Sequence, residues 1–293
     1  MAAEIVGLGE VLWDLLPGGK ALGGAPFNFA FHCHQLGHDS VMVSRVGRDA
    51  LGDEIRAVMR GLGLDDSFVQ ADEEHPTGTV GVTVDERGQP SYAIHEGAWD
   101  HLAWEERLSP LIRGAKAICF GSLVQRHPTA RQTVRRVLAE ASALLTVFDV
   151  NLRQDFYTID VLESSLSASR WAKLNDGELA VLRQLFSLSG EDESEVVADL
   201  RRSFRLDLVA LTRGERGCLV QTEDEQVDLP GERVAVIDTV GSGDAFTAGL
   251  LCSVLEGRPV AEAARFANRL AARVAASRGG TPRLEATEIE RLR

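Results

Sequence analysis

The sequence contains little cysteine, no long apolar run and no excess of positive charge. Its four cysteines, Cys33, Cys119, Cys218 and Cys252, lie far apart without paired spacing, so we expect free thiols in a reducing compartment rather than a disulfide framework. No uninterrupted apolar stretch reaches the roughly 18 residues of a membrane span. No basic side chain precedes Lys20, so no signal peptide is expected either. Together these absences predict a cytoplasmic protein.

The charge balance argues against two classes of partner. The 293 residues include 31 Lys and Arg against 44 Asp and Glu, a net charge of −13. Such a surface repels nucleic acids and anionic membranes, so we expect neither as a partner. A small anionic ligand stays open, because a local group of backbone N–H donors binds phosphate whatever the net charge. The apolar fraction of 44% and the charged fraction of 26% are those of a globular protein with a sizeable core.

Short runs rich in Val and Ile alternate with longer amphipathic stretches. The expected strands span residues 4–9, 40–46, 117–121, 145–150, 172–175, 207–212, 217–221 and 233–238. The expected helices span residues 26–36, 50–62, 129–143, 177–188, 193–204, 245–255 and 260–277. Strands that alternate with helices form right-handed crossovers in a mostly parallel sheet covered on both faces. The sequence therefore predicts an α/β sandwich.

Two segments interrupt this alternation. Residues 11–16 follow the first strand where a crossover helix would be expected, and residues 77–97 have the pattern of a hairpin with strands at 79–84 and 91–95 and a turn at 85–88. No helix follows to cover these strands. We expect a small separate sheet over the strand ends of the main domain, where it acts as a lid that excludes water. The alternative is a hairpin that only decorates the domain or joins two copies of it.

The strongest local signal is the run DTVGSGDAFTAG at residues 238–249. An expected strand leads into a glycine-rich turn that opens an apolar helix, and the unpaired N–H groups of such a turn form an anion site. Gly241 and Gly243 let the backbone approach a phosphate without interference from Cβ. Asp244 repels an anion, which makes sense if it accepts a proton from a hydroxyl beside the transferred group. The alternative is an Asp that only caps the helix.

A second glycine cluster, LGGAPFNFA at residues 22–30, opens another expected helix. Pro26 suits the first helical turn, and the paired glycines permit close approach of a ligand. Asn28 both donates to and accepts from hydroxyl groups, and Asp14 on the expected lid strand accepts hydrogen bonds from hydroxyls. A helix cap and a surface carboxylate are the alternatives for these two side chains.

These two runs resemble the two signatures of the PfkB carbohydrate kinases, in the same order along the chain. The resemblance covers the whole chain and implies a single ribokinase-like catalytic domain over residues 1–293. Its implied fold is a three-layer α/β sandwich with a discontinuous lid at about 10–18 and 76–99. The implied reaction is in-line phosphoryl transfer from ATP, with Mg²⁺, to a sugar hydroxymethyl group.

The resemblance also assigns roles to individual residues. Those implied in catalysis are Asp244 as the base, Gly241, Ser242 and Gly243 as the anion hole, and Arg153 in the run DVNLR. Those implied in sugar binding are Asp14, Gly23, Gly24, Asn28 and Trp99. Those implied around the nucleotide are Asn175, Glu178, Thr212, Gly214, Gly217 and Asn268. Glu178 is implied to act on Mg²⁺ through water, and Asp238, with the backbone near 277–280, is implied to hold K⁺.

Within this family the run GEVLWD at residues 9–14 is most similar to bacterial fructokinases. Ketodeoxygluconate kinases usually carry an Arg on the second lid strand, whereas residues 92–95 read YAIH. This favours a neutral sugar, D-fructose converted to fructose 6-phosphate, with ribose or 2-keto-3-deoxygluconate as the alternatives. Trp99 either covers the apolar face of the sugar or packs in the core.

Four other functions fit the sequence less well. A dinucleotide-binding oxidoreductase would need a third glycine where Leu12 stands after Gly7 and Gly9. No Walker-type phosphate loop occurs, and a non-catalytic sugar-binding protein on this fold would be expected to have lost Asp244. A zinc site at residues 32–34 is disfavoured, because side chains two positions apart on a helix point to different faces.

Overall fold

The computed structural model describes residues 3–16, 18–84 and 90–293, so the expected turn at 85–88 and the Tyr92 side chain lie outside the described part. Within that part, nine strands form one large sheet in the order β13-β12-β11-β10-β9-β8-β1-β4-β5. All neighbours are parallel except the pairs β11–β12 and β12–β13. The strands are β1 Ile5–Leu8, β4 Ser40–Gly47, β5 Val69–Asp72, β8 Ala117–Gly121, β9 Leu145–Asp149, β10 Trp171–Asn175, β11 Leu208–Thr212, β12 Cys218–Gln221 and β13 Gln226–Leu229.

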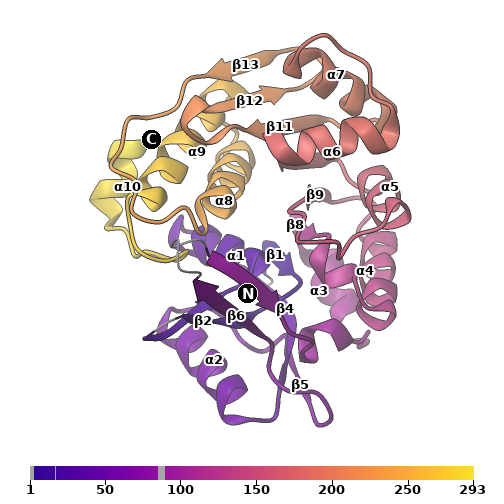
Figure 1. Ribbon diagram of the computed structural model, residues 1–293, viewed down its shortest axis with the longest axis vertical. Coiled ribbons are helices and arrows are strands. Elements are labelled where there is room, and N and C mark those ends of the chain that lie inside the picture. Colours follow the sequence, from indigo (N-terminus) through magenta and orange to yellow (C-terminus); the bar gives the residue numbers. More distant parts are fainter. Residues whose placement is uncertain (1–2, 17, 85–89) are drawn as a thin grey trace.

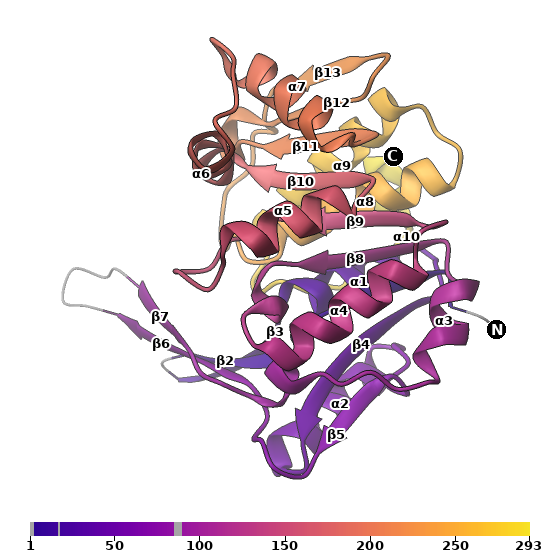
Figure 2. The ribbon, with the colours of Figure 1, turned by 90° about the vertical axis from the view of Figure 1, so that its right-hand side faces the viewer.

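Helices cover both faces of this sheet, as Figures 1 and 2 show. One face carries α3 Leu108–Gly114, α4 Pro128–Glu140, α5 Ile159–Ser167, α6 Asp176–Phe186 and α7 Glu193–Phe204. The other carries α1 Ala25–Gln35, α8 Ser242–Leu255, α9 Val260–Ala275 and α10 Ala286–Leu292, with α2 Ala50–Gly61 packed beside α1. The short 3₁₀ turns are η1 Ala98–His101, η2 Leu123–Gln125 and η3 Gly214–Arg216. The fold is the expected three-layer α/β sandwich.

The central strands are mostly apolar because each one contributes side chains to two cores. In β8, Ala117 and Cys119 pack into the core beneath α8 and α9, whereas Ile118 and Phe120 pack into the core beneath α4 and α5. Successive side chains of a strand point to opposite faces, so a sheet covered on both sides needs continuous apolar runs. No helix in the described part of the chain has the length and apolar character of a membrane span.

A second sheet of four strands projects from the edge at which the parallel strands end (Figure 2). Its order is β3-β2-β6-β7, with β2 Leu12–Leu16, β3 Gly19–Gly23, β6 Thr79–Val84 and β7 Pro90–Ile94. The two expected interruptions of the main domain therefore do meet in one small sheet. β3 was not expected, because its sequence GKALG lacks the alternation of a strand. It pairs with β2 over the whole length of both strands.

The expected strand at 233–238 is wrong. These residues belong to no sheet, and Val236 and Ile237 are 62% and 60% exposed. Their alternating apolar pattern is that of a strand, but β13 already ends the large sheet. The segment lies instead against the end of α9, where the N–H groups of Ile237 and Asp238 donate to the Ala275 carbonyl. The elements β5, β13, α3, α5 and α10 were also missing from the sequence prediction.

Most helices between the two glycine clusters begin at a polar cap. The side chains of Asp49, Thr158 and Asp192 accept hydrogen bonds from the first turns of α2, α5 and α7. In contrast, α1 and α8 begin at Gly24 and Gly241, with φ angles of 113° and 75° and no side-chain cap. Both helix starts thus direct unpaired N–H groups outward.

Candidate functional site

A cavity of about 880 Å³ lies between the carboxyl edge of the large sheet and the small sheet. The small sheet contributes Leu12, Asp14, Val80 and Ile94, and the start of α8 contributes residues 239–244. In open α/β proteins this edge is where ligands bind. The cavity therefore brings the expected lid and the expected anion hole to one place.

The start of α8 has the geometry of an anion site. At Gly241 a side chain would overlap the Gly280 carbonyl, and the φ of 75° also requires glycine. At Gly243 a Cβ would lie 2.8 Å from Lys173 Nζ, so a larger residue would displace that ammonium group. No side chain caps this helix, and residues 239–244 line the cavity, so the positive end of the helix dipole lies at the cavity wall.

Asp244 lies in the first turn of α8 and is 9% exposed. Its Oδ2 accepts a hydrogen bond of 2.8 Å from Asn28 Nδ2 on α1. Burial raises the pKa of Asp244 to about 6, the charge of Asp149 adds to the rise, and Lys173 opposes it. A carboxylate with a pKa near neutrality is suited to accept a proton at physiological pH.

Lys173 is a cavity residue that the sequence prediction missed. It extends from β10 and forms an ion pair with Asp149 at the end of β9, with Nζ 3.1 Å and 3.3 Å from the two carboxylate oxygens. Burial opposes its charge, but Asp149, Glu178 and Asp244 outweigh burial and raise the pKa of Lys173. A fixed cation therefore lies beside the anion hole. The available signal was a lone lysine in the otherwise apolar start of the strand WAKLN.

The loop after β9 supplies Arg153 to the cavity. Asn151 and Gln154 in this loop have φ angles of 39° and 51°, which non-glycine residues rarely adopt. Glu178 holds the loop, because its Oε1 accepts from Leu152 N at 2.9 Å and its Oε2 accepts from Asn175 N at 2.8 Å. Strained loops that the surroundings hold in place are characteristic of functional sites.

Asp14 and Glu10 bring two carboxylates to the small-sheet side of the cavity. Burial raises the pKa of Asp14 to about 6 and that of Glu10 to about 7, and Arg153 opposes both shifts. Gly23 makes room for Asp14, since a Cβ there would lie 2.6 Å from Asp14 Oδ2. Glu10, which the sequence prediction did not include, was signalled only by an acidic side chain between two apolar runs.

Two buried oxygens near this side of the cavity, Glu10 Oε2 and Asn28 Oδ1, have no hydrogen-bond partner among the described residues. Buried acceptors are normally satisfied, and an unpaired one is costly. Both residues line the cavity together with Gly24. A ligand that carries hydroxyl groups would supply the missing donors.

The expected nucleotide residues are divided between the cavity and its surroundings. Asn175 and Thr212 line it. Gly214 and Gly217 form the turn after β11 with φ angles of 55° and 86°, and Asn268 on α9 donates to the Pro230 carbonyl at 3.0 Å. These last three residues, like Glu178, lie outside the lining, so their expected contacts with ATP stay predictions.

Three more expected residues, Gly23, Trp99 and Asp238, also lie outside the lining. Trp99 is 0% exposed and packs against Leu12, Val80 and Leu123, with the Arg126 guanidinium 4.5 Å from its ring. This placement corresponds to the packing alternative. Asp238 accepts hydrogen bonds of 3.0 Å from the N–H groups of Val240 and Gly279, which ties the loop after α9 to the start of α8.

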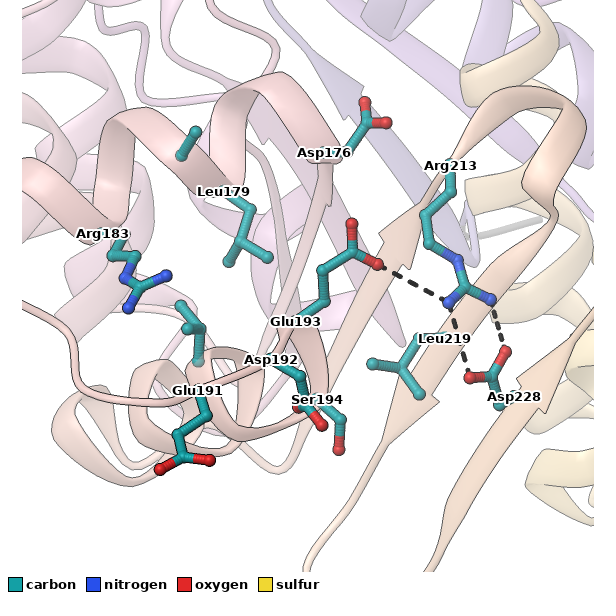
Figure 3. A pocket seen from close by; sticks show the side chains of 12 residues that line it. Asp176, Leu179, Arg183, Glu191, Asp192, Glu193, Ser194, Arg213, Leu219 and Asp228 are labelled. Atoms are coloured by element: carbon teal, nitrogen blue, oxygen red, sulfur yellow. Dashed lines mark hydrogen bonds and ion pairs between the residues drawn. The ribbon is translucent and has the colours of Figure 1, made fainter.

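A second hollow of about 590 Å³ lies between α6, α7 and the antiparallel strands (Figure 3). Its walls carry five carboxylates: Asp176, Glu191, Asp192, Glu193 and Asp228. The Arg213 guanidinium is already paired with Glu193 and Asp228. A phosphate would meet mostly negative charge here, so the start of α8 is the better candidate for an anion site.

Comparison with known proteins agrees with this geometry. Residues 18–287 match the pfkB family carbohydrate kinase. The chain is 30% identical to fructokinase-1 of Oryza sativa subsp. japonica over 318 residues, which covers 99% of this chain and 96% of that protein. It is 30% identical to the fructokinase of Salmonella typhimurium over 266 residues, covering 87% and 85% of the two chains.

The solved structure of an uncharacterised sugar kinase from Pyrococcus horikoshii in complex with ATP superposes with a TM-score of 0.81 at 28% identity, covering 94% of each chain. The glycine-rich starts of α1 and α8, the cavity between them and the length of the match thus lead to one conclusion: the chain belongs to the pfkB family of carbohydrate kinases.

Proposed function

We propose that the protein transfers the γ-phosphoryl group of ATP to the hydroxymethyl group of a neutral sugar, and that the sugar is D-fructose, which becomes fructose 6-phosphate. The observation that carries this proposal is the position of Asp244. This buried carboxylate lies at the uncapped start of α8 and is hydrogen-bonded to Asn28 in the cavity that Asp14 also lines. We place the reaction in the cytosol, where ATP is made and the four free cysteines stay reduced.

In the proposed reaction Asp244 accepts the proton of the sugar hydroxymethyl group. The freed oxygen forms a bond to the γ-phosphorus as the bond to the bridging oxygen of ADP breaks. The N–H groups at residues 241–244, Lys173 and Arg153 stabilise the charge on the transferred group, as preorganised donors do in phosphoryl transfer. A positioned general base typically contributes about 10²–10⁴-fold to the rate.

The donor set near Lys173 fits a magnesium ion held through water. Asp149 and Glu178 are buried carboxylates, and each Glu178 oxygen accepts one N–H bond and so keeps a lone pair for a bound water. Mg²⁺ prefers oxygen ligands and keeps most of its water shell. When bound, it would neutralise charge on the phosphate oxygens. K⁺ at Asp238 belongs to the same proposal and is tested by replacing K⁺ with a large organic cation at equal ionic strength.

The charge of the cavity supports a neutral sugar. Asp14 lines the side next to the small sheet, and Glu10, with a pKa of about 7, adds negative charge there as the pH rises through neutrality, so the carboxylate of a sugar acid would meet like charge. The sequence of β7, PSYAI, contains no cation to compensate, and an unpaired buried charge is strongly unfavourable. The free oxygens of Glu10 and Asn28 suit sugar hydroxyls instead. The two relatives named fructokinase, at 30% identity, support fructose among neutral sugars.

The test is an ATP-consumption assay with D-fructose, D-ribose, 2-keto-3-deoxygluconate and a nucleoside. We expect the highest kcat/KM with D-fructose. If ribose or 2-keto-3-deoxygluconate exceeds fructose tenfold, the assignment to fructose is wrong and the kinase chemistry stands. If calorimetry detects sugar binding while no sugar consumes ATP, the protein is a non-catalytic sugar-binding member of the family.

Pairing of two copies through the small sheet is part of the same proposal. Leu15 and Leu16 on β2 are among the exposed large apolar side chains, and a second copy would cover them. Sedimentation velocity distinguishes a monomer from such a dimer.

A further inference from the structure

Three of the seven histidines gather at the foot of the small sheet. The rings of His75 and His101 are stacked with centroids 3.5 Å apart at 11°, and the rings of His101 and His127 lie 4.2 Å apart at 48°. None of the three lines the cavity described above. Neither the kinase fold nor the proposed reaction explains why three imidazoles from separate segments should meet here.

A carboxylate completes the cluster. Glu96, two residues beyond β7, has Oε1 3.0 Å from His101 Nε2. One ligand atom each from Glu96, His101 and His127 lies within 4.8 Å of the other two, and no other set of this kind was found among the described residues. Two ligands with bonds of about 2.0–2.2 Å at a tetrahedral angle lie roughly 3.3 Å apart. The His101–Glu96 pair already has nearly this separation.

We propose that Glu96, His101 and His127 bind one divalent transition-metal ion of the Zn²⁺ type. Two imidazoles and one carboxylate are ligands that Zn²⁺, Cu²⁺ and Ni²⁺ accept, whereas Mg²⁺ and Ca²⁺ prefer oxygen ligands throughout. The fourth position is open to solvent, because the Glu96 side chain is 67% exposed. The site is distinct from the Mg²⁺ and K⁺ positions discussed above.

The surroundings hold the His101 imidazole in place. The His101 side chain is only 14% exposed, and its backbone carbonyl accepts a hydrogen bond of 2.7 Å from Arg45. The His75 ring packs flat against His101 and is itself fixed by buried Asp72, whose Oδ2 lies 3.1 Å from His75 Nδ1. Such outer contacts orient metal ligands. Glu96 is the exposed member that moves to close the ligand triangle.

Binding exchanges weak contacts for metal bonds. In the metal-free protein His101 Nε2 and Glu96 Oε1 face each other at 3.0 Å, and a metal ion between them would replace this contact. A metal bond through His127 Nδ1 would replace a long hydrogen bond of 3.3 Å from the Thr129 N–H at the start of α4.

The site would join the small sheet to the body of the molecule. Glu96 follows β7, and His127 precedes α4. Arg126, next to His127, already donates to the carbonyls of Ile94 and His95 at 3.3 Å and 2.8 Å. A metal between Glu96 and His127 adds a second connection at this position. We therefore expect the metal to stabilise the junction between the small sheet and α4.

The experiment uses the full-length chain without a histidine tag, treated with chelator and then dialysed. Zn²⁺ binding is measured by competition with a chromophoric chelator, and Co²⁺ binding by visible absorption. We expect about one equivalent bound per chain, a rise in Tm with Zn²⁺, and a loss of affinity of at least tenfold in His101→Gln and in His127→Gln. His95→Gln removes a nearby exposed histidine outside the ligand set and should bind as wild type does.

Glu96→Gln keeps the test decisive if a histidine variant folds poorly, because this exposed side chain contributes little to the core. It should lower the Zn²⁺ affinity by at least severalfold with an unchanged metal-free Tm. The proposal is overturned if wild-type protein takes up no more Zn²⁺ than His101→Gln/His127→Gln. Equal affinity in wild type and Glu96→Gln would likewise exclude this ligand set.

Discussion

Asn28 Nδ2 donates a hydrogen bond of 2.8 Å to Asp244 Oδ2, although 216 residues separate the two side chains. The contact joins α1 to α8, the two helices that begin at glycines without a side-chain cap. It orients the Asp244 carboxylate and leaves Asn28 Oδ1 free for a ligand. The two glycine-rich runs therefore form one site.

Asp244→Asn should abolish most of the turnover without removing either ligand. The amide is of the same size and still accepts the Asn28 hydrogen bond, but it cannot take up a proton. We expect kcat to fall by at least about 10²-fold while sugar and ATP affinities stay within a few-fold. Steady-state kinetics and calorimetry measure these quantities, with Asp39→Asn on the exposed surface as the control. Turnover within threefold of wild type would show that Asp244 is not the base.

The pH dependence of kcat should show an acid limb. Burial raises the pKa of Asp244 to about 6, and below this pH the carboxyl group holds its proton and cannot act as a base. We expect kcat at saturating sugar to be constant near pH 7–8 and to fall about tenfold per pH unit below about 6. Asp14→Asn should keep this limb, since Asp14 acts on binding. A kcat that does not change between pH 8 and pH 5 would contradict the prediction.

The sequence predicted the parts of the fold that local pattern determines. Apolar strand runs and amphipathic helices gave the central sheet and its two covered faces. The failures arose where tertiary context overrides the local pattern. Residues 233–238 alternate like a strand but have no neighbour to pair with, whereas the glycine-containing β3 is a strand because β2 lies beside it. Short α3, with a proline inside it, has too few residues for a helical period.

The residues of the candidate site likewise divide into those that the local sequence identifies and those that depend on tertiary context. Asp244 and Asn28 were predictable because each stands in a glycine-rich helix start. Glu10 and Lys173 were not predictable, because each is a single charged residue in an apolar run. Their place in the site depends on which strands end at the same edge of the sheet, and the local sequence does not show this. Lys173 of β10 meets Asp149 of β9 in this way. The histidine cluster combines residues from three separate segments.

Lys173→Met should destabilise the protein strongly. The change leaves the Asp149 carboxylate buried without its cation, and breaking a buried ion pair on one side costs about 3–5 kcal/mol. The double variant Asp149→Asn/Lys173→Met should recover part of this loss. Urea unfolding measures both variants. Lys116→Met breaks an exposed pair with Glu4 and should cost at most about 1 kcal/mol. Similar losses in Lys173→Met and Lys116→Met would refute the importance of the buried pair.

Glu10→Gln should stabilise the protein at pH 8. Burial raises the pKa of Glu10 from 4.5 to about 7, so the folded state binds the proton more tightly than the unfolded state does. This contribution to stability is present below the unfolded pKa and is lost as the pH rises through about 7. The shift corresponds to at most about 3 kcal/mol at pH 8. Thermal unfolding should show a higher Tm for Glu10→Gln at pH 8 and little difference at pH 4. Exposed Glu223→Gln is the control, and equal Tm values at pH 8 would contradict the prediction.

Asp14→Ala should separate sugar binding from chemistry. Asp14 lies on β2 at the small-sheet side of the cavity, whereas Asp244 lies at the start of α8. A side chain that holds the sugar equally in the ground state and the transition state changes KM and leaves kcat nearly unchanged. We expect KM for D-fructose to rise at least tenfold, kcat to fall less than threefold, and KM for ATP to stay constant. Asp14→Asn keeps one hydroxyl acceptor, so its KM for D-fructose should lie between those of wild type and Asp14→Ala. If Asp14→Ala instead lowers kcat as Asp244→Asn does, Asp14 takes part in the chemical step and the division of labour between the two carboxylates is wrong.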